Sequence, residues 1–245
     1  MPADRRLAII TGGASGIGRA TADMLAQEGY YLVLIDRAGA EEAAAGFPGQ
    51  AEGVSLDIED VAVVRQTMAD IATRHVAVDA VVCCAGISGR GKPFAEVDEA
   101  DFDAMMDIHV RGHFFLIQSL LKTFESGAAI VLVSSSYARI GHVGMPHYAA
   151  AKGALLALTK SLAAELGPSG VRVNAVTPGL VRTPMTEKSA EFVPGLFENM
   201  IEHTPLRRLA APAEIAATIA YLLSPAASAM TGQALSPSAG FVMAD

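Results

Sequence analysis

The chain has 245 residues, 51% of them hydrophobic, and a formal net charge of −8 at pH 7. This length suffices for one large core, and an acidic balance without a Lys/Arg cluster disfavours nucleic-acid binding. The longest apolar runs are strand-length, well below the ~20 residues of a membrane span, and no signal peptide is visible. We therefore expect a cytoplasmic protein with a small-molecule substrate, and neither a membrane nor a nucleic acid as partner.

Short apolar runs alternate with helical patterns along the whole chain. We expect strands at 7–11, 31–35, 52–56, 79–84, 128–134, 171–176 and 233–236, and helices at 17–28, 39–46, 59–74, 98–124, 147–167 and 212–223. Such alternation predicts an α/β fold with a doubly wound, seven-stranded parallel sheet of the Rossmann type, covered by helices on both faces. No linker or repeat divides residues 1–245, so we expect a single domain.

A glycine-rich turn follows the first strand, at Gly12, Gly16 and Gly18. These glycines would let the chain turn, let the backbone approach a pyrophosphate and let the next helix pack closely, while the helix N-terminus binds the phosphates. Asp36 ends the second strand, where a carboxylate accepts hydrogen bonds from the adenosine ribose and repels a 2′-phosphate. We therefore expect NAD rather than NADP, although Arg37 would accommodate the extra phosphate.

Ser135 precedes Tyr148 by thirteen residues, and Lys152 follows Tyr148 by four. Residues four apart on a helix share a face, so the phenol and the ammonium would point into one site. A cation about 4 Å away is worth roughly 4 kcal/mol at an effective dielectric of 20, or about 3 pK units. We expect this charge to outweigh burial and to bring the Tyr148 pKa towards neutral pH. The alternative is a packed Tyr beside a solvated Lys; the neighbouring motifs favour a site.

With the glycine turn, Asp36, Ser135, Tyr148 and Lys152 in this order, the chain resembles the short-chain dehydrogenase/reductase family almost end to end. The resemblance implies hydride transfer between a nicotinamide C4 and an alcohol or carbonyl carbon. It implies that Tyr148 is the acid/base, that Ser135 polarises the substrate oxygen, and that Lys152 lowers the Tyr148 pKa and grips the nicotinamide ribose. It also implies a homotetramer, with a dimer as the alternative.

The resemblance extends the dinucleotide site beyond the glycine turn. The family contacts adenine at Asp57 and Ile58, and holds the nicotinamide carboxamide at Val181 and Thr183. The implied cofactor-binding set is Gly12, Ser15, Gly16, Ile17, Gly18, Asp36, Arg37, Asp57, Ile58, Ala85, Gly86, Tyr148, Lys152, Pro178, Gly179, Val181 and Thr183. No metal site is expected, because the two cysteines lack nearby histidines.

The chain departs from the family pattern at two places near the expected site. His109 replaces an asparagine that supports a water relay to the lysine. A histidine would hold the same water and titrate near neutral pH, which makes it a catalytic candidate, or it is a tolerated polar replacement on a packed helix. Cys83 and Cys84 replace paired asparagines and lose their amide hydrogen bonds. Adjacent strand residues point to opposite faces, so we expect no disulfide between them.

Residues 182–209 interrupt the regular alternation with several prolines. An insertion at the carboxyl ends of the strands is where a substrate lid belongs, and a packed surface excursion is the alternative. We therefore expect an NAD-dependent oxidoreductase acting on a secondary alcohol or ketone such as a polyol, sugar, hydroxy acid or cyclic alcohol. The alternatives are an NADPH-dependent 3-oxoacyl-carrier-protein-type reductase and a non-catalytic dinucleotide-binding protein.

Overall fold

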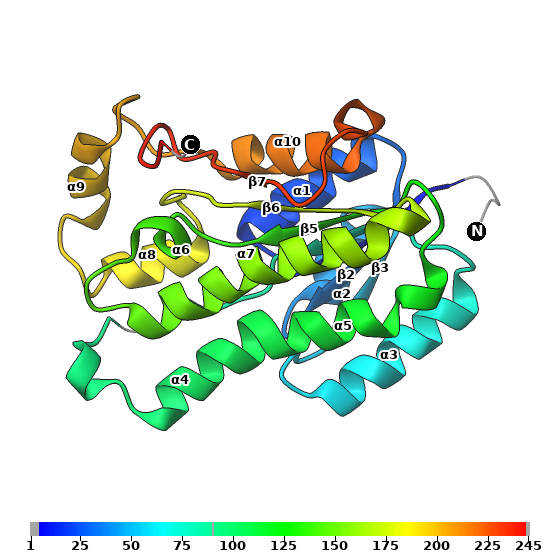
Figure 1. Cartoon of the computed structure of the whole chain (residues 1–245), viewed down its shortest axis with the longest axis horizontal. Helices are drawn as coiled ribbons and strands as arrows, with labels where there is room; N and C mark the ends of the chain where they lie inside the picture. The colour runs from blue at the N-terminus through cyan, green and yellow to red at the C-terminus, as the bar shows by residue number, and fades with distance from the viewer. Residues whose placement is uncertain (1–4, 90, 244–245) are drawn as a thin grey trace.

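The computed structural model describes residues 5–89 and 91–243 and contains one seven-stranded parallel sheet (Figure 1). The spatial order is β3-β2-β1-β4-β5-β6-β7. The strands are β1 (Leu7–Thr11), β2 (Tyr31–Asp36), β3 (Ala51–Ser55), β4 (Ala80–Cys83), β5 (Ala129–Val133), β6 (Arg172–Val176) and β7 (Ala234–Leu235). The order reverses between β1 and β4, and this switch point opens a crevice at the carboxyl ends of the strands, where such sheets bind ligands. The predicted doubly wound fold is confirmed.

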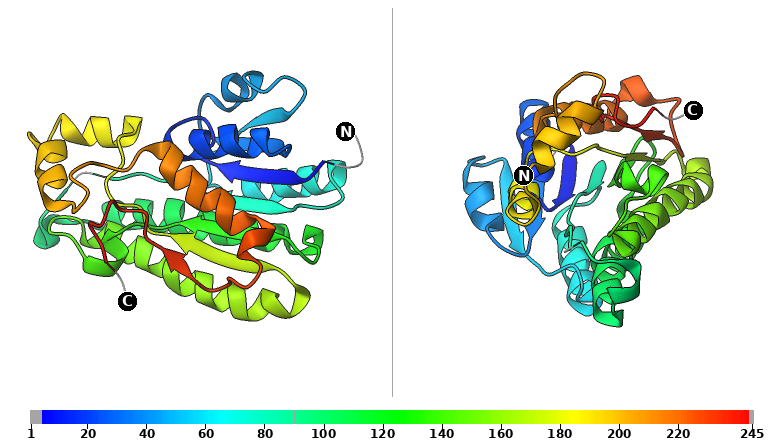
Figure 2. Two further views of the ribbon diagram at one scale, coloured as in Figure 1. Left: turned by 90° about the horizontal axis from the view of Figure 1, so that it is seen from above. Right: turned by 90° about the vertical axis from the view of Figure 1, so that its left-hand side faces the viewer.

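Helices cover both faces of the sheet (Figure 2). They are α1 (Gly16–Gln27), α2 (Ala40–Ala45), α3 (Val61–Arg74), α4 (Glu99–Met106), α5 (His113–Ser119), α6 (Tyr137–Ile140), α7 (Pro146–Leu166), α8 (Pro184–Ala190), α9 (Leu196–His203) and α10 (Pro212–Leu223). Short 3-10 turns occupy Phe94–Glu96, Leu121–Thr123, Gly167–Ser169 and Pro225–Ala227. One face carries α1, α2 and α10, and the other carries α3, α5 and α7.

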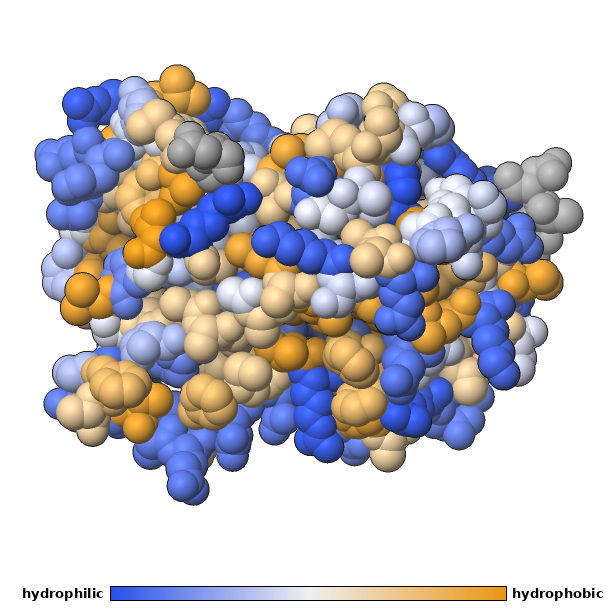
Figure 3. All heavy atoms as spheres, viewed as in Figure 1, coloured by the Kyte–Doolittle hydropathy of each residue, from blue (hydrophilic) through white to orange (hydrophobic). Residues whose placement is uncertain are grey.

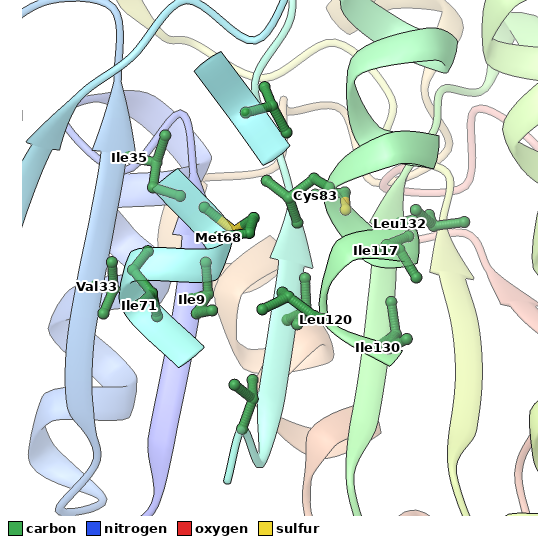
Figure 4. Packing of buried hydrophobic residues seen from close by; sticks show 14 of the residues in the cluster. Ile9, Val33, Ile35, Met68, Ile71, Cys83, Ile117, Leu120, Ile130 and Leu132 are labelled. Carbon is green, nitrogen blue, oxygen red and sulfur yellow. The ribbon is translucent and has the colours of Figure 1, made fainter. Parts of the chain in front are cut away.

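The core is divided by the sheet into two apolar clusters. In β1, Ile9 packs with α3 and α5 on one face, whereas Ile10 packs with α1 and α10 on the other. Figure 4 shows Met68 and Ile71 of α3 over the first of these clusters. Full burial of one such side chain contributes about 1.5–3 kcal/mol. Because both faces are covered, the central strands are continuous apolar runs, which is why they stand out in the sequence.

The expected helix over residues 98–124 is not continuous. A π-helical turn, Asp107–Gly112, separates α4 from α5, and a 3-10 turn follows α5. The turn adds a residue to the helical repeat and therefore rotates the side chains around it; such turns often occur at functional sites. The segment 182–209 is also more regular than expected, since it contains the two short helices α8 and α9.

No helix within the described ranges has both the length and the apolar character needed to cross a membrane. Cys83 and Cys84 are both free thiols.

Candidate active site

The glycine-rich turn joins β1 to α1. Gly12 and Gly16 have φ angles of 68° and 56°, in the left-handed region that favours glycine. A Cβ atom on Gly18 would lie 2.1 Å from the carbonyl oxygen of Gly12, so a side chain there would displace the backbone. Ser15 is the N-cap of α1, yet its side chain makes no capping hydrogen bond. The first turn, which includes Ile17, thus presents uncapped N–H groups at the positive end of the helix dipole, an arrangement suited to phosphate.

A pocket of about 380 Å³ lies beside this turn at the end of β2. Asp36 is in its wall, and the Oδ2 atom of Asp36 accepts a hydrogen bond from the Ala14 N–H at 3.1 Å. Arg19, a second lining residue, already pairs with Asp23 at 3.0 Å. The full lining is Ala14, Ser15, Arg19, Asp36, Ala38, Gly39, Glu42 and Ala43. The carboxylates of Asp36 and Glu42, with an Arg19 guanidinium that is already paired with Asp23, favour ribose hydroxyl groups over a 2′-phosphate in this pocket.

The loop after β4 touches both the glycine turn and the π turn. A Cβ atom on Gly12 would lie 2.9 Å from the backbone nitrogen of Ala85. One on Gly86 would lie 2.3 Å from Cε1 of His109. These close approaches place Ala85 and Gly86 beside the glycine turn and the π turn, with no room for a larger side chain at Gly86.

The loop after β6 closes the crevice from the other half of the sheet. Its Pro178 carbonyl accepts a hydrogen bond from the Ser136 N–H at 2.9 Å. Thr183, the N-cap of α8, lies against the glycine turn, because a Cβ atom on Gly16 would be 3.3 Å from its Cγ2 atom. The two remaining predicted contacts in this loop are Gly179 and Val181.

Three residues that the sequence analysis placed at the adenosine end of the cofactor, Asp57, Ile58 and Arg37, do not line the pocket beside Asp36. Asp57 is exposed after β3, and its Oδ1 atom accepts a hydrogen bond from the Glu59 N–H at 3.1 Å. Ile58 is buried against Gly112. Arg37 is exposed, and its charge acts on Glu59.

Ser135 follows β5, and Tyr148 and Lys152 lie one turn apart on α7. The side chains of Ser135 and Tyr148 are hydrogen-bonded. The Lys152 Nζ atom lies 5.8 Å from the centroid of the Tyr148 ring and donates to the Val133 carbonyl at 2.8 Å. The Ser134 hydroxyl donates to the Lys152 carbonyl at 2.7 Å, which fixes α7 against the end of β5. The three residues that the sequence singled out are thus in one cluster.

The protonation states in this cluster differ from the sequence-based expectation. Burial raises the pKa of Tyr148 to about 12, and the hydrogen bond with Ser135 opposes the rise. Burial lowers the pKa of Lys152 to about 8. The expectation that the ammonium outweighs burial is therefore wrong for this structure: burial has the largest effect on the Tyr148 pKa, and Nζ donates its hydrogen bond to the Val133 carbonyl. Tyr148 carries its proton at neutral pH.

His109 lies in the π turn and stands edge-on to Tyr148, with ring centroids 5.5 Å apart. Its Nε2 atom is 2.8 Å from the Ile87 carbonyl oxygen and 3.4 Å from the Ile87 backbone nitrogen; the shorter contact, to an oxygen that only accepts, places the ring proton on Nε2. Its Nδ1 atom is buried without a hydrogen-bond partner among the described residues. Burial and then the charge of Lys152 lower the pKa of His109 well below 6.5, which favours the second of the two alternatives, a polar replacement that does not titrate near neutral pH.

These residues fit a bound dinucleotide. The glycines leave a cradle that a Cβ atom would fill, the helix N-terminus is uncapped, and the pocket beside Asp36 offers carboxylate acceptors for ribose hydroxyls. No cluster of three or more metal-ligating side chains occurs in the part of the chain that the structure describes.

The sequence argument missed two residues of this region, Thr11 and His113, whereas Tyr137 is one of the substrate-pocket candidates after Ser135. The Tyr137 ring lies 6.4 Å from the Tyr148 ring and stacks on His142 at 4.2 Å. Thr11 and His113 are fully buried, and the Thr11 Oγ1 atom lies 2.9 Å from the His113 Nε2 atom. The available signal was spacing, since His113 follows His109 by four residues on an expected helix.

Comparison with known proteins finds relatives along almost the whole chain. Residues 12–242 match the family model described as enoyl-(acyl carrier protein) reductase. The 3-oxoacyl-[acyl-carrier-protein] reductase FabG of Thermotoga maritima is 32% identical over 250 residues, covering 99% of this chain and 100% of that protein. A crystal structure of a short-chain dehydrogenase/reductase, glucose/ribitol dehydrogenase, from Brucella melitensis has a TM-score of 0.91 at 37% identity, covering 98% of this chain and 97% of the other. A second Brucella melitensis structure, 3-ketoacyl-(acyl-carrier-protein) reductase complexed with NADH, has a TM-score of 0.89 at 31% identity, covering 97% and 98%.

Proposed function

The chain belongs to the short-chain dehydrogenase/reductase family, and we propose that it is an NAD-dependent oxidoreductase acting on a secondary alcohol or its ketone. The observation that carries this proposal is the cluster of Ser135, Tyr148 and Lys152 beside a glycine cradle. Bound nicotinamide would accept or supply the hydride. The substrate classes that we propose are polyols, sugars, hydroxy acids and cyclic alcohols.

The three clustered side chains take different parts in moving the proton. Tyr148, protonated at neutral pH, donates its phenolic proton to a carbonyl oxygen during reduction and takes it back during oxidation. Ser135 holds the same oxygen, since its hydroxyl is already hydrogen-bonded to the Tyr148 side chain. Lys152 keeps a positive charge 5.8 Å from the centroid of the Tyr148 ring and stabilises the phenolate when it forms; it would also hold the ribose of a bound nicotinamide dinucleotide.

His109 acts in this proposal as a neutral hydrogen-bonding group, not as an acid or base. Its fixed Nε2 proton anchors the ring to the Ile87 carbonyl, which leaves the buried Nδ1 lone pair to accept a hydrogen bond. A water at Nδ1 would serve the relay to Lys152 that an asparagine supports elsewhere in the family. The ring also fixes the edge of Tyr148, with which it is in contact.

The preference for NAD rests on the pocket at the end of β2. Asp36 and Glu42 both line it, and both repel the two negative charges of a 2′-phosphate. Arg37 does not line it. Ser15, Ile17, Ala85, Pro178 and Thr183 complete the proposed contacts along the crevice, with Asp57 and Ile58 at the adenine end.

The remaining proposals concern the lid, the assembly and the compartment. Residues 182–209, with α8 and α9, form a substrate lid; the hydroxyls of Ser189 in α8 and Ser88 after β4 lie 3.2 Å apart across its edge. We propose a homotetramer in the cytoplasm. Apolar side chains lie on the face formed by α4, α5 and α7, where Phe102 and Phe114 are 45% and 41% exposed, as a subunit contact requires (Figure 3).

A 3-oxoacyl-carrier-protein reductase using NADPH is the second candidate. It is favoured by FabG of Thermotoga maritima and by the ketoacyl reductase of Brucella melitensis, although the latter structure holds NADH. A non-catalytic dinucleotide-binding protein is disfavoured, because binding alone has no need for the complete Ser135, Tyr148 and Lys152 cluster.

The proposal is tested by a panel of polyols, sugars, hydroxy acids and cyclic alcohols with NAD or NADP, and by a 3-oxoacyl thioester with NADH or NADPH. Nicotinamide absorbance reports turnover in each case. Alcohol oxidation with NAD at a higher kcat/KM than with NADP supports the proposal. Turnover of the thioester alone, with NADPH preferred, would replace it by the second candidate.

A further inference from the structure

A buried chain of hydrogen bonds links the glycine turn, the end of β4 and the π turn. Thr11 ends β1, and its Oγ1 atom accepts from the N–H groups of Cys84 at 3.0 Å and Ala85 at 3.1 Å. The same oxygen lies 2.9 Å from Nε2 of His113. The Nδ1 atom of His113 lies 2.9 Å from the carbonyl oxygen of His109. Thr11 and His113 are each 0% exposed.

The geometry assigns the Thr11 hydroxyl proton and the His113 ring proton. Thr11 Oγ1 uses its acceptor capacity on two backbone N–H groups, which leaves one hydroxyl proton to donate. Its possible acceptors are His113 Nε2 at 2.9 Å and the Val82 carbonyl at 3.4 Å, and the shorter contact takes the proton. Nε2 is then unprotonated, so Nδ1 carries the ring proton and donates it to the His109 carbonyl. Burial lowers the pKa of His113 to about 4, which agrees with a neutral ring.

These hydrogen bonds join the glycine turn, the loop after β4 and the π turn, which are the three segments that line the proposed dinucleotide site. Thr11 is followed by Gly12, whose Cβ position lies 2.9 Å from the Ala85 nitrogen. Gly86 comes next in the β4 loop and packs against the His109 ring. At such close approach, a shift of one segment by a fraction of an ångström alters the cradle that the others form.

These hydrogen bonds also explain how this protein tolerates Cys83 and Cys84 in place of paired asparagines. A thiol is only a weak hydrogen-bonding group, so the two cysteines cannot hold the end of β4 as amides would. Instead, the backbone N–H groups of Cys84 and Ala85 are held by Thr11, and Thr11 is oriented by His113.

We propose that His113 is a positioning residue for dinucleotide binding, acting through Thr11 and touching neither dinucleotide nor substrate. This inference rests on the proposed use of a dinucleotide. The hydrogen bond between His113 and Thr11 sets the affinity for the dinucleotide, because Thr11 holds the glycine turn and the loop after β4 together. The contact of His113 with the His109 carbonyl secures the ring and has less influence on binding.

The two ring nitrogens can be tested separately with three variants. His113→Gln places an amide near the Nε2 position and can retain the acceptor for Thr11. His113→Asn places an amide near the Nδ1 position and retains only the donor to the His109 carbonyl. His113→Leu removes both contacts. The NADH dissociation constant is measured by fluorescence titration, and kcat is measured separately at saturating dinucleotide.

We expect His113→Gln to bind NADH within about 3-fold of wild type, whereas His113→Asn and His113→Leu bind about 10-fold more weakly, with kcat within about 3-fold in all three. Equal NADH affinity in all variants, or loss of kcat without loss of affinity, would overturn the inference. Should the His113 variants not fold, Thr11→Ser and Thr11→Val provide the same comparison: only Thr11→Val should weaken binding, and equal affinity in that pair overturns the inference. Wild-type protein that binds neither NADH nor NADPH would instead overturn the proposed function.

Discussion

Replacing Lys152 with methionine should stabilise the folded protein while abolishing turnover. The Lys152 side chain is only 4% exposed, and its pKa falls from 10.5 to about 8 on burial. At ~1.36 kcal/mol for each pKa unit, the buried ammonium costs about 3 kcal/mol. Loss of its hydrogen bond to the Val133 carbonyl costs about 1–3 kcal/mol, because the buried carbonyl loses this donor. We expect Lys152→Met to raise the free energy of unfolding by up to about 2 kcal/mol at pH 7.

The gain should depend on pH in a defined direction. Below pH 8 the amine is charged in both the folded and the unfolded chain, so the full cost of burying the charge is present. Between pH 8 and 10.5 the folded chain releases its proton first, and the unfolded chain binds more protons; wild-type stability therefore rises with pH. The advantage of Lys152→Met should shrink across this window and reverse above it, where only the lost hydrogen bond to the Val133 carbonyl remains.

Thermal and urea unfolding at several pH values measure this difference. A gain of about 2 kcal/mol corresponds to a Tm increase of roughly 4–8 °C for a domain of this size. Lys160→Met is the matched control, because Lys160 is exposed on the same helix and its removal should leave stability within about 0.5 kcal/mol. Lower stability of Lys152→Met at pH 7, or a gain that persists unchanged at pH 11, would refute the reasoning.

Two further predictions concern the dinucleotide pocket and the π turn. Asp36→Ala should raise NADP affinity relative to NAD by about 5–30-fold, as expected for removing about 1–2 kcal/mol of charge repulsion, and Glu42→Ala in the same pocket should give a smaller shift. Parallel titrations with both dinucleotides measure this ratio, and an unchanged ratio would remove the basis for the NAD preference. His109→Asn should keep kcat within about 3-fold and leave the pH profile between 6 and 8 unaltered, because burial holds the pKa of His109 well below 6.5. A break in the wild-type profile near pH 6.5 that disappears in His109→Asn would contradict this.

The sequence predicts the fold well because the sheet is buried on both faces. Strands such as Leu7–Thr11 and Ala129–Val133 are continuous apolar runs, and their positions were predicted to within about one residue. The pairing of Tyr148 with Lys152 follows from spacing on a helix, whereas the family resemblance adds Ser135, and the structure does bring the three residues together. Local periodicity is sufficient for the strands and for the pair on the helix.

Features that depend on the balance between burial and charge, or on contacts between distant segments, were not predictable. The direction of Lys152 Nζ towards Val133 decides that burial outweighs the ammonium at Tyr148, and spacing alone carries no such information. The π turn at Asp107–Gly112 is invisible in a pattern that reads as one helix. The bond between Thr11 and His113 joins residues 102 positions apart, so only the folded chain reveals it.

The central claim is that Tyr148 transfers the proton while the cradle binds dinucleotide independently. It is tested most directly by measuring, for Tyr148→Phe, the NADH dissociation constant and the single-turnover rate of hydride transfer with the best substrate of the panel. The account predicts an NADH dissociation constant within a few-fold of wild type and a transfer rate reduced by about 10²–10⁴-fold, the usual size of general acid–base catalysis. A transfer rate within a few-fold of wild type would contradict it.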